Sequence, residues 1–181
     1  MDEDWRAGKR INEFFTSKDR KTNSNLRYFH YTGRRCIKTG IGMAAIVSRK
    51  LNIPIINLGF SGNGKLEAPV VSLIKELDAK IYILDGLGNM AGFPTDTIIG
   101  RLKKTVKSLR EGKPNVPIVI TEDPHPSIES LDLRVESIYK RINKIEKSVF
   151  AALKSSGMKD IYYLESDSIG LMPKVPSRGC I

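Results

Sequence analysis

Four short apolar runs alternate with amphipathic helical patterns between residues 42 and 166. The runs read IPIINL (53–58), KIYILDG (80–86), VPIVITE (116–122) and KDIYYLES (159–166). Short continuous apolar runs rich in isoleucine and valine are typical of strands that are buried on both faces of a sheet. The alternation therefore predicts an α/β protein, in which helices cover a mainly parallel sheet on both sides.

The four helical patterns have recognisable ends. They span residues 42–52, 65–79, 95–114 and 127–157. The first ends at Asn52, and the second has Pro69 in its first turn, where proline is tolerated. The third begins at a Thr or Asp cap and stops at Gly112 and Pro114, residues that commonly lie just beyond a helix. Helices and strands thus follow one another with short connections, as in one compact α/β unit.

The length of 181 residues indicates a single domain with a less regular segment at each end. Residues 1–41 are polar and basic with little periodicity, and we expect them to be poorly structured. Residues 42–170 should form the α/β domain, and residues 171–181 an irregular tail. Ligands of open parallel sheets bind beyond the carboxyl ends of the strands. We therefore expect the functional site at the segments that follow three of the predicted strands, namely GFSGNG (59–64), DGLGNM (85–90) and TEDPHP (121–126).

The glycine-rich turn at residues 59–65 admits several interpretations. It fits the phosphate-binding spacing G-x-x-x-x-G-K, but Leu66 stands where that site needs a Ser or Thr for the metal ion. It also approaches a nucleophile elbow centred on Ser61, except that Asn63 replaces the second glycine of that motif. A plain connector accounts for one glycine more easily than for Gly59, Gly62 and Gly64 together.

The stretch SRKLNIPIINLGFSGNGKLEAPVVSLIKELDAKIYILDGLGNM (48–90) resembles the SGNH, or GDSL-type, hydrolases. The resemblance implies a three-layer sandwich with flavodoxin-like strand order and hydrolysis of a carbohydrate ester or small acyl ester. It places one oxyanion-hole donor on the Gly62 N–H and the other on the Asn89 side-chain amide. Two preorganised donors of this kind stabilise the negative oxygen of a tetrahedral intermediate. It implies no metal and no organic cofactor.

Two blocks of that family are missing from the chain. The family has its serine nucleophile after the first strand and an acid–histidine block near the C-terminus, where this chain reads YFHYTGRRCIKTG and LMPKVPSRGCI. We hypothesise a reading-frame displacement, because synonymous codons for residues 27–34 can be regrouped to spell Gly-Thr-Ser-Ile-Thr-Gln-Gly. Residues 171–181 can be regrouped, in the other displaced frame, to a block that resembles the histidine block. We therefore expect a disrupted first strand and an inactive or impaired esterase.

Other residues near the predicted site are candidates for substrate binding, namely Ser61, Asn63, Glu122 and His125, with Asp123 beside Glu122. A ligand-binding protein that keeps the pocket without catalysis, or a P-loop-like nucleotide binder, remains an alternative. A net charge of +10 raises the question of nucleic acid, but no recognition motif supports it and we expect none. We also expect no membrane segment. No signal peptide is visible, which favours the cytoplasm by default, although relatives are often exported.

Overall fold

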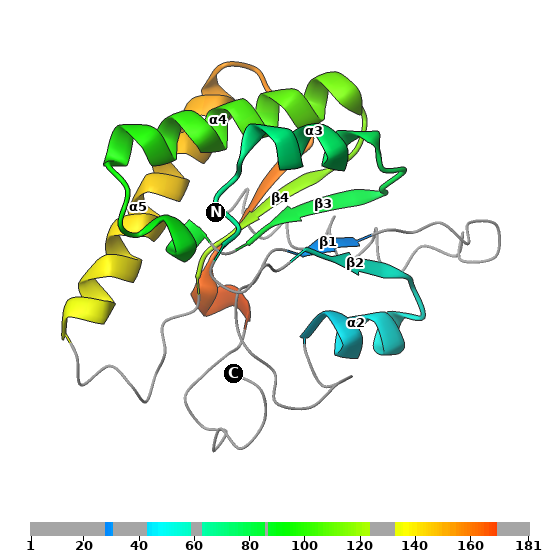
Figure 1. Cartoon of the computed structure of the whole chain (residues 1–181), viewed down its shortest axis with the longest axis horizontal. Coiled ribbons are helices and arrows are strands. Elements are labelled where there is room, and N and C mark those ends of the chain that lie inside the picture. The colour runs from blue at the N-terminus through cyan, green and yellow to red at the C-terminus, as the bar shows by residue number, and fades with distance from the viewer. Residues whose placement is uncertain (1–27, 31–42, 59–62, 86, 124–132, 170–181) are drawn as a thin grey trace, which may run out of the picture.

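The computed structural model describes residues 28–30, 43–58, 63–85, 87–123 and 133–169 (Figure 1). Within these ranges, five strands form one parallel sheet in the order β2-β1-β3-β4-β5. The strands are β1 (Tyr28–His30), β2 (Ile55–Asn57), β3 (Ile81–Leu84), β4 (Ile118–Thr121) and β5 (Ile161–Leu164). This order is the flavodoxin-like one, so the predicted fold class is confirmed.

Strand β1, which lies between β2 and β3, is short, and it lies in the segment for which the sequence predicts a disrupted strand. It has three residues, against four in each of β3, β4 and β5. Tyr28 pairs with Ile55 of β2 on one side and with Ile81 of β3 on the other. A strand in this position joins the β2 edge to the rest of the sheet, so it fixes how the end of β2 faces the end of β3.

In the same ranges, four α-helices and two short 3-10 helices accompany the sheet. They are α2 (Met43–Leu51), α3 (Ala68–Glu76), η2 (Leu87–Met90), α4 (Thr95–Gly112), α5 (Leu133–Ser155) and η3 (Ser166–Ile169). Helices α3, α4 and α5 lie over one face of the sheet, and α2 lies on the other side beside β2 (Figure 1). The crossovers between the parallel strands are right-handed. The chain runs from β1 to β2 in one direction along the sheet and then from β2 toward β5 in the opposite direction. Helix α2 therefore lies on the opposite face from the other three helices.

The helix ends follow local chemistry. Asn52 directly follows α2 with a φ of 52°, and Gly157 follows the end of α5 with a φ of 85°. Asparagine and glycine adopt this left-handed conformation at low cost. Helix α4 differs from the expectation of a Thr or Asp cap, because Pro94 is its N-cap and no side chain of the described residues caps it. Asp96 instead lies in the first turn, where a negative charge favours the helix dipole.

The main core lies between the sheet and helices α3, α4 and α5. Ile98, Leu102 and Val106 of α4 are completely buried against it, as are Tyr82 of β3 and Ile118 of β4. On the opposite face of the sheet, a smaller buried cluster is formed by Ile81, Ile83 and Val119. Alternate residues of β3 and β4 thus pack on opposite faces, which explains why these strands read as continuous apolar runs.

Candidate functional site

The carboxyl ends of the parallel strands bring the predicted segments to one edge of the sheet. The glycine-rich turn follows β2, Asn89 and its turn follow β3, and Glu122 and Asp123 follow β4. Gly62, Ser61 and His125 lie outside the described residues, so their roles stay predictions. Asn63, Asn89 and Glu122 are described, and their surroundings define what this edge can do.

The described end of the glycine-rich turn packs closely against the fold. Asn63 is exposed, while Gly64 next to it is buried. Leu66, which stands where a phosphate-binding loop has its Ser or Thr, is buried in the core and has a φ of 54°. A buried leucine side chain offers no oxygen to a metal ion, so the local structure gives the P-loop interpretation no support.

Asn89 faces this turn from the 3-10 helix η2. Its side-chain Nδ2 lies 3.5 Å from the carbonyl oxygen of Gly64, a long contact that leaves the amide able to turn toward a better acceptor. Arg101 of α4 donates to the carbonyl of Lys65 over 2.8 Å, and its guanidinium lies 4.9 Å from the centre of the Phe93 ring. These contacts join the turn after β2 to the segment that follows Asn89.

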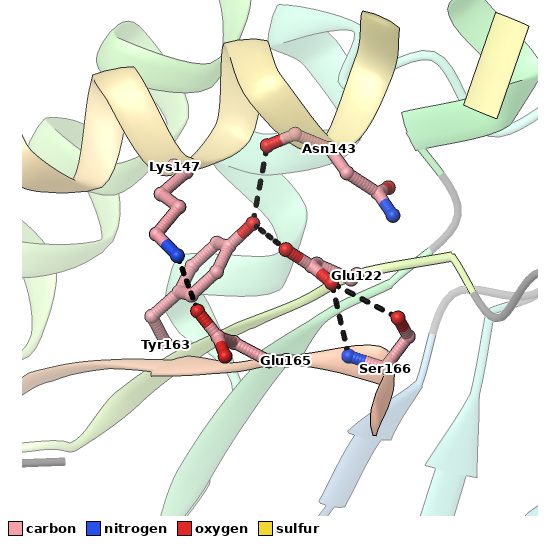
Figure 2. A network of polar contacts seen from close by, with 6 residues as sticks. All are labelled: Glu122, Asn143, Lys147, Tyr163, Glu165 and Ser166. Atoms are coloured by element: carbon pink, nitrogen blue, oxygen red, sulfur yellow. Dashed lines mark hydrogen bonds and ion pairs between the residues drawn. The ribbon is translucent and has the colours of Figure 1, made fainter. Parts of the chain in front are cut away.

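Glu122 is the centre of a polar network at the ends of β4 and β5 (Figure 2). Its Oε1 lies 2.7 Å from the hydroxyl of Tyr163, and its Oε2 accepts both the N–H and the Oγ–H of Ser166 over 3.0 Å. The Tyr163 hydroxyl also lies 3.1 Å from the carbonyl of Asn143, and Lys147 pairs with Glu165 beside it. Both carboxylate oxygens of Glu122 are therefore engaged within the protein.

This network decides how Glu122 and Tyr163 titrate. Burial alone would raise the pKa of Glu122, but the hydrogen bonds from Ser166 and Tyr163, together with the charge of Lys147, lower it below its ordinary value. For Tyr163, burial and the neighbouring carboxylates raise the pKa. Glu122 is thus an ionised acceptor at neutral pH, and Tyr163 is a neutral donor. Whether Glu122 also contacts a substrate stays a prediction.

Glu146 of α5 is a functional candidate that the sequence reasoning missed. It is completely buried, and neither of its carboxylate oxygens has a hydrogen-bond partner among the described residues. Burial and the nearby charges of Asp123, Asp85 and Glu122 raise its pKa well above the ordinary value. The signal was present in the sequence, because Glu146 stands four residues after Ile142 and three before Val149, on the apolar face of the helix.

The described part of the chain holds no group of three or more His, Cys, Asp or Glu side chains arranged for a metal ion. The expectation that the protein uses no cofactor nevertheless stays a prediction. Across the ranges that the structure covers, no helix is both long and apolar enough to cross a membrane.

Comparison with solved structures finds similar folds among GDSL-type proteins and esterases. A protein described as a GDSL-like lipase from Bacteroides ovatus has a TM-score of 0.70 and 26% identity over 83% of this chain and 47% of its own. The salicylyl-acyltransferase SsfX3 of a tetracycline biosynthetic pathway has a TM-score of 0.68 and 22% identity, over 80% of this chain and 44% of its own.

A family two carbohydrate esterase from Clostridium thermocellum, solved with cellohexaose, has a TM-score of 0.56 and 15% identity over 78% of this chain and 53% of its own. The chain thus spans about half the length of these solved structures. Comparison with curated protein sequences yields no match. A sequence model of the GDSL-like lipase/acylhydrolase family matches residues 31–174. Since this match covers most of the chain, the protein belongs to the GDSL-like lipase/acylhydrolase family.

Proposed function

We propose that this edge of the sheet is the oxyanion-stabilising part of an ester hydrolase site, whose substrate is a carbohydrate ester or a small acyl ester. The contact between Asn89 and Gly64 carries the proposal. The Asn89 amide, after β3, lies 3.5 Å from the carbonyl oxygen of Gly64 in the turn after β2, and Gly62, the other predicted donor, stands two residues before Gly64 in the sequence. Two N–H donors that converge on one oxygen stabilise the charge of a tetrahedral intermediate.

The geometry at Asn89 supports this role. Its Nδ2 contact with Gly64 is at the outer limit of a hydrogen bond, so little is lost when the amide donates to a substrate oxygen instead. At the described end of the turn, the carbonyl of Lys65 accepts a hydrogen bond from Arg101, whose guanidinium lies over the Phe93 ring, so this end is held against α4. Preorganised donors cost no reorganisation at the moment when charge develops.

The substrate class rests on family relatives. Among the similar structures, one is named a carbohydrate esterase and another a salicylyl-acyltransferase. The first name describes an enzyme that acts on an ester of a carbohydrate, and the second an enzyme that transfers a salicylyl group. An acyl ester, on a carbohydrate or on a smaller alcohol, is therefore the substrate class that we propose for this site.

We further propose that the chain, as given, is inactive or impaired. Hydrolysis by this route needs a nucleophile, a base and a group that orients the base, in addition to the oxyanion donors. The serine block and the acid–histidine block of the family do not occur at their expected positions in the sequence. Displacement of the reading frame at both places would account for their loss together.

An assay with p-nitrophenyl acetate tests this proposal. The chain should be compared with a version in which residues 21–40 and 171–181 are restored to the alternative frames. The restored protein should be at least about 10²-fold faster, the lower range for general acid–base assistance. Ser61→Ala should change the rate of the present chain little. Rapid turnover that Ser61→Ala abolishes would contradict the proposal and favour a nucleophile elbow at the glycine turn.

A further inference from the structure

Two acidic residues directly follow β4, the strand that lies between β3 and β5 in the sheet. Their backbone continues the sheet, since the N–H of Glu122 donates to the carbonyl of Leu164 over 3.0 Å. Their side chains bind opposite neighbours: Glu122 binds the turn after β5, and Asp123 binds the turn after β3. The pair is therefore placed to connect the two turns that flank it.

On the β5 side, Glu122 holds the first residue of η3. Its Oε2 accepts from both the backbone N–H and the hydroxyl of Ser166, and its Oε1 is fixed by Tyr163 (Figure 2). Hydrogen bonds to an ionised acceptor are about twice as strong as those between neutral groups. The start of η3 is thus tied to the end of β4 through one carboxylate.

On the β3 side, Asp123 holds the residue that precedes Asn89. The N–H of Gly88 donates to Asp123 Oδ2 over only 2.6 Å. A Cβ atom on Gly88 would lie 2.6 Å from the same oxygen and 3.2 Å from the Tyr139 ring, so a larger residue there would push the Asp123 carboxylate away. The Nδ2 of Asn143 donates to the Asp123 carbonyl over 3.3 Å and steadies the backbone of the acidic residue.

We propose that Glu122 and Asp123 act as a clamp that fixes the Asn89 turn and the η3 turn relative to each other. Asp123 is then a positioning residue for the Asn89 amide, and Glu122 is the positioning residue for the chain that continues beyond β5. The inference rests on the proposed oxyanion role of Asn89. The two halves of the clamp are separable, because each carboxylate binds a different turn.

Amide signals of the ¹⁵N-labelled full-length chain test the clamp. In Asp123→Asn, loss of the charge should make hydrogen exchange at Gly88 about tenfold faster or more and should shift the side-chain amide signals of Asn89. The Ser166 amide should stay as in the unchanged protein. In Glu122→Gln the pattern should reverse: Ser166 should exchange faster, while the Gly88 and Asn89 signals stay in place.

Glu165→Gln is the matched control. It removes a carboxylate at the same edge, one that pairs with Lys147, and should move neither the Gly88 nor the Asn89 signals. The clamp is overturned if Asp123→Asn leaves the Gly88 and Asn89 signals unchanged. It is also overturned if Asp123→Asn and Glu122→Gln affect both turns equally, since that would indicate general loosening.

Titration with methyl acetate separates this inference from the proposed function. Methyl acetate carries the uncharged carbonyl of a small acyl ester, and it should shift the Asn89 side-chain signals of the unchanged protein. A lack of response would contradict the oxyanion role of Asn89. The exchange rates of Gly88 and Ser166 in the two variants would still decide whether the clamp exists.

Discussion

Replacing Glu146 with glutamine should remove a pH-dependent cost from the folded state. The Glu146 carboxyl group is completely buried and lacks a hydrogen-bond partner within the part of the chain that the structure describes. Burial and three neighbouring acidic groups raise its pKa well above the ordinary value. Glutamine has almost the same shape but cannot ionise. The substitution therefore measures the effect of proton binding on stability without changing the packing.

The direction and size of the effect follow from proton linkage. An unfolded glutamate loses its proton at about pH 4.3, whereas folded Glu146 keeps it to a higher pH. Between these two pKa values the folded state binds one more proton, so its stability is greatest at low pH and falls as the pH rises. For one proton the slope is about 1.4 kcal/mol per pH unit. Glu146→Gln should lack this contribution. Its free energy of unfolding, relative to that of the unchanged protein, should therefore increase as the pH rises through that window.

Urea unfolding, followed by circular dichroism at several pH values from about pH 5 upward, measures this difference. That range lies above the pH values at which Glu122 makes stability depend on pH, because the pKa of Glu122 is lowered in the folded state. A group with a lowered pKa gives a stabilisation that is lost only as the pH falls through the folded-state value. Glu111→Gln, on the exposed side of α4, is the control and should keep the unchanged slope. If Glu146→Gln also keeps that slope, Glu146 is not held as a neutral acid.

Three further substitutions, each measured by urea or thermal unfolding, test the fold. Ile98→Ala, at a completely buried site, should lower the free energy of unfolding by about 2–5 kcal/mol. Its control is Leu73→Ala, whose side chain is 65% exposed and whose effect should stay within about 0.5 kcal/mol. Arg110→Lys should lower the Tm, because its guanidinium donates to backbone carbonyls before both β4 and β5 and one ammonium cannot span them. Gly157→Ala should cost about 1–2 kcal/mol, because a Cβ atom disfavours the left-handed backbone that Gly157 adopts. Gly92→Ala should not, since a Cβ atom there would meet no described atom within 4 Å.

The sequence predicted those elements whose periodicity is local. All four apolar runs contain a strand, and Asn52, Pro69 and Gly112 mark helix ends as expected. For β1 the sequence predicted only a disrupted strand, because Tyr28–His30 follows a polar stretch with no alternation, and its place in the sheet depends on pairing with β2 and β3. Pairing with distant strands overrides weak local preference.

The candidate site was predictable in outline and not in its contacts. Asn89 and Glu122 were placed at strand ends by the parallel-sheet pattern, and the structure describes both there. The partner of Glu122, Ser166, is 44 residues away in the sequence, and no local pattern links them. The same holds for Asp123, which was considered for substrate binding and which the structure brings against Gly88. Such contacts depend on the order of the strands, which single-sequence periodicity does not determine.

The acidic groups at this edge behave differently because their surroundings differ. Glu122 receives three hydrogen bonds, which lower its pKa, whereas Glu146 receives none from the described residues, and burial and its charged neighbours raise its pKa. We predict that this acidic edge disfavours the phosphates of a nucleic acid in spite of the net charge of +10, because like charges repel. The proposed substrate, an ester, is uncharged at its reacting carbonyl and would meet no such repulsion near the Asn89 amide.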